Sequence, residues 1–490
     1  MLDCLNNFLW EKVLVIALIS VGIIFTVASR FVQFRYVKQM IAIFGQNSTS
    51  ESEHLSSLQA LILSVAGRVG AGNIAGVAVA ITLGGPGAIF WMWVVGLIGM
   101  ATSFFECTLA QLFKRVNPDG TYRGGPAYYI RYGLGQWWLS AIFSVLLLVT
   151  FGFGFTALQS YTVAESLHDT FGIPVHISGL VLMAVLAVTI FGGVKRIAEV
   201  AEWVVPLMAA GYFAIAFFII ATHWSSIPSM VLLIFKSAFG LEQAVGGGIG
   251  VAMMFGIKRG LASNEAGLGS APNVAAVAHV SHPVNQGIVQ AFSIFIDTIV
   301  LCSCTAAIIL LSTVYVPGDA LVGGVTLTQA AMADHVGSLG SAFVTIALAL
   351  FAFTSTIYNY YLGENSLNFF SENNNLLFGG FRLATLALVL WGTSQDLGTV
   401  FGFADITMGL LALVNLVVLV ALFPVTMKVI QDYDSQIKQG IADPVFDQRH
   451  FMELNLDAEA WARDEEHRGE SPVPQEHQGS ELLGPQLLLE

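Results

Sequence analysis

Eleven long apolar runs dominate this sequence and decide what it can fold into. A helix needs about 20 apolar residues to cross the hydrocarbon core of a bilayer. In lipid each run must also pair its own amides and carbonyls, which favours helices. The pattern predicts an all-α integral membrane protein with about eleven transmembrane helices. The runs lie near 13–33, 58–83, 87–112, 137–166, 175–192, 198–222, 239–257, 285–312, 339–368, 376–392 and 400–427.

The composition excludes several classes of protein. Only 11% of the 490 residues are charged, whereas soluble domains carry about a quarter charged residues. An ordinary cytosolic enzyme is therefore excluded, and the absence of a basic block with interleaved aromatics argues against a nucleic-acid partner. The sequence contains no metal-spaced His, Cys, Asp or Glu cluster, nucleophile elbow or phosphate loop. We therefore predict a protein without enzyme activity and without a bound cofactor.

The lysines and arginines predict an orientation in the membrane, because cytoplasmic loops are enriched in both. If the loop after the first span is cytoplasmic, thirteen of them fall on that side, Lys258 and Arg259 included. Two fall on the other side, and Arg68 lies inside a span. This distribution predicts a multi-pass protein with its N-terminus outside and its C-terminus in the cytoplasm.

The C-terminal tail, residues 429–490, has a different composition from the rest of the chain. It holds 14 of the 33 acidic residues and 4 of the 20 basic ones, which gives it a net charge of −10. After an amphipathic beginning, its sequence has too little apolar surface to fold alone. We expect an acidic cytoplasmic tail that is mobile and partly disordered.

Two of the spans contain glycine clusters that are expected to interrupt a helix. In the second span, glycines at 67–76 surround Arg68 and Asn73, and the seventh span contains Gly246–Gly250. Glycine lowers helix propensity by about 1 kcal/mol, and non-helical backbone is tolerated at membrane depth only when it is buried in protein or lines a cavity. Close helix packing could also explain glycines, but packing needs neither Arg68 nor Asn73. Two such breaks imply one shared polar cavity.

The spacing of the two breaks suggests an internal repeat. Residues 1–57 hold an extra N-terminal helix and a cytoplasmic connection, and residues 58–222 and 223–428 each hold five spans that open with the broken one. An odd number of spans places the two halves in opposite orientations. This is the pattern of a secondary transporter with a site at the membrane midplane. A channel would instead need a continuous lined pore.

Four strings in this sequence are distinctive: GRVGAGNIAGVAVAITLGGPGAIFWMWVVGLIGMATSFFECTLAQ, TYRGGPAYYI, GLASNEAGLGSAP and FIDT. They closely resemble motifs of the alanine or glycine:cation symporter family, the sodium:alanine symporters, and the resemblance extends over about residues 10–430. It implies a LeuT-type five-plus-five inverted repeat with one extra N-terminal helix, in a bacterial inner membrane. It also implies alternating-access uptake of small neutral amino acids such as alanine and glycine, with Na⁺ as the coupling ion.

A more distant resemblance suggests roles for individual residues. The run Val69–Asn73 is similar to the V-G-x-G-N of the unwound first core helix in LeuT-type neurotransmitter symporters. The resemblance implies that the amides of Ala71 and Gly72, beside Asn73, hold the substrate carboxylate. It implies a sodium site formed by Ala66, Val69, Thr354 and Ser355. From residue type alone, the two hydroxyls would instead bond to their own helix. Further expected substrate-binding residues are Gly246, Gly247, Gly248, Ser355 and Asn359.

Arg68 stands where the neurotransmitter symporters have a small residue. Their second sodium site is therefore not expected in this protein. A guanidinium stays charged and needs a partner. Asp297, at mid-depth in the eighth span, is the expected partner, within about 6 Å. A structural ion pair is favoured over a direct substrate contact, and Asp297 as a cation ligand is the third option. Coupling to H⁺ through Asp297 is the alternative to coupling to Na⁺.

Asn359 is a second departure, because a bulky aromatic residue is expected in this substrate-facing part of the helix. Asn is smaller and offers both a donor and an acceptor. We therefore expect a pocket that admits serine or glutamine alongside alanine and glycine.

Overall fold

The fold was taken from a computed structural model of the whole chain. It describes residues 6, 8–42, 56–117, 120–241, 248–316, 324–371 and 374–461, and only the backbone of 193–202 and 205. Helices make up most of the structure. Within these ranges the strands are β1 (Arg115–Val116) and β2 (Tyr122–Arg123), an antiparallel pair that joins Arg115 to Arg123.

Seven helical segments are long and apolar enough to cross a membrane. They are η1–α2 (Phe8–Ala28), α7 (Gly87–Leu112), α9–η5–α10 (Trp137–Phe171), α16–η7–α17 (Pro283–Leu310), α19 (Ser338–Phe370), α20 (Asn375–Gly392) and α21 (Leu397–Ala421). Two bent pairs also qualify when each is counted as one span: α5 (Ser57–Arg68) with η3–α6 (Gly72–Gly84), bent by 56°, and Pro206–Thr222 of α12 with η6–α13 (Trp224–Ala238), bent by 76°. The protein is therefore a helical integral membrane protein.

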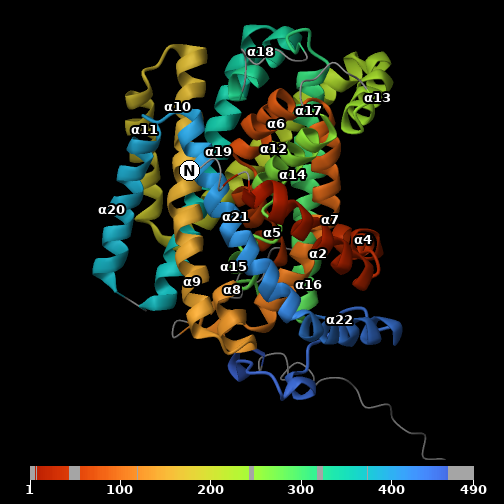
Figure 1. The fold of residues 1–490 in the computed structure, drawn as a ribbon. Helices are drawn as coiled ribbons and strands as arrows, with labels where there is room; N and C mark the ends of the chain where they lie inside the picture. Colours follow the sequence, from red (N-terminus) through yellow and green to blue (C-terminus); the bar gives the residue numbers. More distant parts are fainter. Residues whose placement is uncertain are drawn as a thin grey trace, which may run out of the picture.

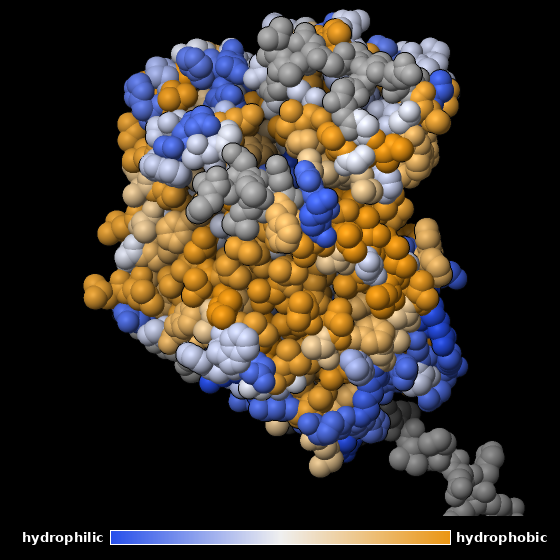
Figure 2. Space-filling view, in the orientation of Figure 1, coloured by the Kyte–Doolittle hydropathy of each residue, from blue (hydrophilic) through white to orange (hydrophobic). Residues whose placement is uncertain are grey.

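The remaining elements connect or cover these spans. They are α3 (Val32–Arg35), α4 (Val37–Ala42), α8 (Pro126–Tyr128), η4 (Tyr129–Gly133), α11 (Val175–Ile190), α12 (Gly193–Thr222), α14 (Gly248–Asn264), α15 (Ala271–Ala275), α18 (Gly324–Val336), α22 (Phe423–Lys438) and η8 (Gln448–Phe451). In Figure 1, α13 and α18 lie at the upper end of the molecule and α22 at the lower end. Figure 2 shows a broad hydrophobic zone between two more hydrophilic ends, as expected for a protein embedded in a bilayer.

Helix α14 packs directly on α7 because glycines remove the side chains between them. A Cβ at Gly256 would collide with the Ala88 carbonyl of α7, and a Cβ at Gly260 would collide with Val95. Small residues allow helix backbones to approach closely in membranes. This contact fixes α14 beside α7.

The break expected at Gly246–Gly250 lies partly outside the described residues, which omit Gly246 and Gly247. Gly248 is the exposed first residue of α14, and this helix is continuous from Gly248 to Asn264. Irregular backbone that the sequence did not predict follows α14 over 265–270. Glu265, Gly267 and Gly269 there have φ values of 57°, 82° and 79°, a region that side chains disfavour.

Lys258 and Arg259 are not cytoplasmic loop residues. Both are buried within α14, so the count that supports the orientation falls to eleven basic residues against two. Both residues were assigned to a loop because the seventh apolar run ends at residue 257.

Part of the acidic tail is packed against the protein. Trp461 is 2% exposed, and its Nε1 donates to the Leu112 carbonyl at 3.4 Å. The Phe446 amide donates to the Ser281 carbonyl at 2.8 Å. Phe446, Phe451 and Trp461 form a buried aromatic cluster, with Phe446 4.9 Å from Phe451 and 4.8 Å from Trp461. These aromatic side chains bury apolar surface that the average composition of the tail does not reveal. The segment up to residue 461 is therefore packed on the protein, whereas the composition predicted a mobile tail.

The packing of α14 gives a test with a control on the same helix. Gly256→Ala should destabilise the protein by about 1–3 kcal/mol, because the added methyl overpacks the contact with α7. Gly250→Ala should not destabilise it, since a Cβ there meets open space. Thermal unfolding in detergent measures both. Equal midpoints for the two variants would contradict the packing described here.

Candidate functional site

Helix α19 packs against the first broken helix at its break. Helix α5 ends at Arg68, Val69 is extended with ψ 97°, and η3 begins at Gly72. A Cβ on Gly67 would lie 2.5 Å from the Tyr358 ring, and a Cβ on Gly70 would lie 2.5 Å from the Ser355 Oγ. Two of the glycines that predicted the break are therefore also required by the approach of α19.

Three backbone carbonyls converge on the Ser355 hydroxyl. Its Oγ lies 3.5 Å from the Ala66 oxygen, 3.0 Å from the Gly67 oxygen and 3.1 Å from the Val69 oxygen. A hydroxyl can donate one proton only, so these carbonyls have more acceptor capacity than Ser355 can satisfy. Unwound carbonyls and hydroxyls are the ligands with which broken membrane helices bind Na⁺. The predicted sodium ligands Ala66, Val69 and Ser355 are thus close together.

Thr354, the fourth residue expected in this set, is oriented differently. Its Oγ1 donates to the Phe351 carbonyl of its own helix at 3.0 Å. This is the ordinary arrangement for a hydroxyl in a membrane helix. The structure therefore brings three of the four predicted sodium ligands together and leaves the Thr354 hydroxyl bonded to its own helix.

The backbone amides at the break are capped by side-chain amides. The Ala71 amide donates to Oε1 of Gln159 in α10, and the Gly70 amide donates to Oδ1 of Asn73, each at 3.0 Å. Sequence analysis missed Gln159. A signal existed, because a glutamine in the middle of an apolar span is costly unless it faces the bundle interior.

Asn73 and Asp297 are direct partners. Nδ2 of Asn73 donates to Asp297 at 2.6 Å, Ser263 donates to it at 2.7 Å and Thr298 at 2.8 Å, and all four side chains are fully buried. The network joins η3, α14 and η7. Neutral N–H and O–H donors bind the oxygens of Asp297. This carboxylate therefore has hydrogen-bond partners without a cation in direct contact.

Among the described residues, the Arg68 guanidinium donates to neutral oxygens: the Ser293 hydroxyl, the Gln290 carbonyl at 3.4 Å and the Ser103 hydroxyl at 3.2 Å. Several well-placed dipoles from α7 and α16 serve here. The expected proximity of Arg68 and Asp297, within about 6 Å, stays a prediction.

Two further carboxylates lie near Arg68 and hold the irregular backbone that follows α14. Glu106 accepts bonds from the Gly267 amide at 3.2 Å and from Nδ2 of Asn415 at 3.0 Å. Glu265 accepts a bond from the Ser270 hydroxyl. These contacts stabilise the break at 265–270 beside the one at 69–71.

The remaining predicted substrate residues differ in their surroundings. Asn359 is 1% exposed, and its Nδ2 has no hydrogen-bond partner among the described residues. Gly248 is exposed, and at 1.5 Å per residue it lies about 22 Å along α14 from Ser263. The structure therefore separates Gly248 from the first break.

A narrow cavity of about 20 Å³ connects the two breaks. Its walls come from the first broken helix, η5, α10, α14 and α21, and they combine charged, amide and apolar groups. The lining residues are Gly67, Arg68, Gly72, Gly76, Phe155, Leu158, Gln159, Arg259, Ala262, Glu265 and Phe401. Such a mixture suits a small zwitterion.

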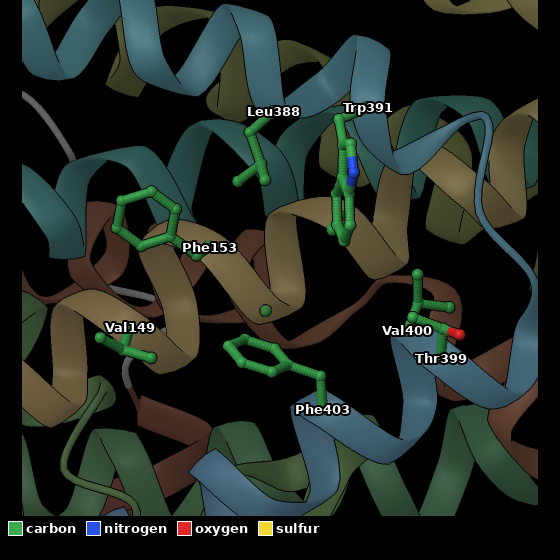
Figure 3. A pocket seen from close by; sticks show the side chains of 9 residues that line it. Val149, Phe153, Leu388, Trp391, Thr399, Val400 and Phe403 are labelled. Carbon is green, nitrogen blue, oxygen red and sulfur yellow. The ribbon is translucent and has the colours of Figure 1, made fainter.

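A larger hollow, of about 390 Å³, is chemically unsuited to a small zwitterion. Figure 3 shows it between η5, α20 and α21, with lining side chains Val149, Phe153, Leu388, Trp391, Thr399, Val400 and Phe403. Thr399 carries the single side-chain hydroxyl of this lining and no residue in it is charged. The smaller cavity is therefore the candidate site.

Comparison with known proteins identifies the family. The model of the sodium:alanine symporter family matches residues 1–448. The chain belongs to the sodium:alanine symporter family. As a member of this family it is a membrane transporter that couples a cation to an amino acid, and not an enzyme, as the sequence predicted.

Similar proteins cover nearly the whole chain. It is 46% identical over 443 residues to the "Probable sodium/glutamine symporter GlnT" of Bacillus subtilis, covering 90% of this chain and 91% of that protein. It is 45% identical over 456 residues to the "Amino-acid carrier protein AlsT" of the same organism, covering 93% and 96%. It is 40% identical over 425 residues to the "Sodium/proton-dependent alanine carrier protein" of Bacillus sp. (strain PS3), covering 83% and 94%.

Proposed function

We propose that this protein takes up small neutral amino acids together with Na⁺ by alternating access. The observation that carries the proposal is the group of three carbonyls around the Ser355 hydroxyl. Oxygen ligands of this kind suit a hard cation, and they belong to the broken helix that also lines the cavity. Ala66, Val69 and Ser355 would hold the ion, and Thr354 would join them by turning away from Phe351.

The substrate would bind in the cavity beside the sodium. Ala71, Gly72 and Asn73 begin the outer half of the broken helix, and a half-helix N-terminus favours a carboxylate. Gln159 caps the Ala71 amide at 3.0 Å, and a substrate carboxylate would replace that cap. Arg68 adds positive charge to the cavity wall.

Asn359 would extend the range of substrates. Its side chain is buried and offers an unused N–H donor, which suits a polar substrate side chain. The relative named as a sodium/glutamine symporter is 46% identical. We therefore propose serine or glutamine as substrates in addition to alanine and glycine.

The architecture that we propose has eleven crossings arranged as a LeuT-type inverted repeat in a bacterial inner membrane. Support comes from the seven straight and two bent spans, from the apolar helix α11, and from α14 followed by α15 across a second break. The N-terminus would lie outside, and the tail that begins with α22 would be cytoplasmic.

Coupling to H⁺ is the second candidate function. Asp297 favours it, because this carboxylate is fully buried and joins three elements, two of which border the breaks. A relative of 40% identity carries the name sodium/proton-dependent alanine carrier. In this case Asp297 would carry the proton, and the carbonyls around Ser355 would have only a structural role.

The sodium assignment predicts a specific defect in Ser355→Ala. Removing one ligand should raise the Na⁺ concentration for half-maximal uptake by about tenfold or more, since contacts to a charge contribute about 1.5–3 kcal/mol. Adding Thr354→Ala should increase the defect. Ser366→Ala, whose hydroxyl bonds to the Leu362 carbonyl of the same helix, should leave Na⁺ activation unchanged. Unaltered activation in the double variant refutes the assignment.

The proposed substrate range predicts how a substitution at Asn359 changes uptake. Asn359→Trp should abolish serine and glutamine uptake and retain alanine and glycine uptake, because the indole fills the space and removes the donor. A panel of radiolabelled amino acids measures this. Strict alanine and glycine selectivity in the unmodified protein, unchanged in the variant, would remove Asn359 from the site.

A further inference from the structure

Asp405 in α21 pairs with two cations from α14. Its carboxylate lies 2.7 Å from Nζ of Lys258 and also contacts the Arg259 guanidinium. The three side chains are 7%, 9% and 4% exposed. The cluster therefore joins α14, which leads into the second break, to α21. It carries one more positive charge than negative.

The N-terminal segment encloses one side of this cluster. Nε1 of Trp10 donates to the Asp405 carbonyl at 3.2 Å. Nζ of Lys258 lies 3.5 Å from Oδ1 of Asn6 and 5.5 Å from the centre of the Trp10 ring. Lys258 is thus held against the extra N-terminal helix, and it does not line the cavity between the two breaks.

Arg259 faces the other way, into that cavity. Arg259 and Phe401 both line it, and the guanidinium carbon lies 5.0 Å from the centre of the Phe401 ring. The Nε of Arg259 is buried and has no hydrogen-bond partner among the described residues. One of the two cations on Asp405 therefore contacts the cavity and the other does not.

Arg259 and Phe401 bound the cavity on the side where α14 and α21 begin. Arg259 lies three residues before Ala262 and six before Glu265, which line the cavity farther along the same chain segment. Phe401 lies four residues closer than Asp405 to the start of α21 at Leu397. Asp405 therefore holds Arg259 in place at this end of the cavity.

We propose that the Arg259–Asp405 contact is the gate that closes the cavity toward the side where α14 and α21 begin. Lys258 keeps Asp405 paired when Arg259 moves away. A buried ion pair is costly to break because it leaves a bare charge, and the second cation removes that penalty. The inference rests on the proposed transport function and adds a residue that controls access to its site.

Chemical labelling of the cavity tests the gate without requiring transport. Ala262→Cys places a thiol in the cavity wall, and a charged, membrane-impermeant maleimide is applied to intact cells in Na⁺-free buffer. The background from the native cysteines is measured on the chain without this substitution. Adding Arg259→Gln should raise the labelling rate about tenfold or more, because a charge-assisted contact is lost. Arg259→Lys, which keeps the charge but lacks the planar fork, should give an intermediate rate.

Lys258→Gln is the matched control, since it removes the neighbouring cation and leaves the Arg259–Asp405 contact. It should label at the rate of Ala262→Cys alone. Membrane insertion and unfolding temperature are checked for every variant, and Arg259→Lys decides the test if Arg259→Gln fails to fold. A rate unchanged by either Arg259 substitution, or raised as strongly by Lys258→Gln, overturns the proposal.

Two exposed residues check the side of labelling. Ser226→Cys before α13 should react in intact cells, and Ser435→Cys in α22 only after permeabilisation. If they react the other way round, the proposed orientation is wrong, and the same comparison is made on inside-out vesicles. A chain that labels as expected but takes up no amino acid refutes the proposed function and leaves the gate standing.

Discussion

Backbone groups inside a bilayer have to find partners within the protein, and the rest of this structure depends on how that requirement is met at two breaks. At 69–71 the free carbonyls meet Ser355 and the free amides meet Gln159 and Asn73. At 265–270, Glu106 and Asn415 bind the Gly267 amide and carbonyl. Each break is thus stabilised by side chains from other helices. In the site that we propose, a cation and a zwitterion would compete for these partners.

Each buried charge has its own hydrogen-bond or ion-pair partners close by. Arg68 donates to neutral oxygens, and Asp297 accepts from neutral donors. Asp405 alone among the described mid-membrane carboxylates has direct contact with cations, and it has two of them. Because each charge has partners of its own, helices can shift against one another without leaving an unpaired charge in lipid.

The sequence predicted the first break because glycine, Arg68 and Asn73 occur together in an apolar span, and only a cavity explains all of them. It did not predict the break at 265–270, because glycines at 246–250 and at 267–269 look alike in composition. The left-handed backbone at Glu265 depends on tertiary contacts that no local pattern encodes. Residue type suggested a charged partner for Arg68, and it could not predict the neutral oxygens to which Arg68 donates. Gln159 and the cluster at Arg259 require knowledge of which helices are neighbours.

The central claim is that a Na⁺ gradient drives amino-acid uptake through this protein. The most direct measurement uses purified protein in liposomes with an imposed inward Na⁺ gradient at constant pH, and labelled alanine outside. The account predicts accumulation above the equilibrium level, which is lost when the Na⁺ gradient is collapsed. A pH gradient alone, without Na⁺, should drive none. Accumulation driven by the pH gradient and indifferent to Na⁺ would contradict the account.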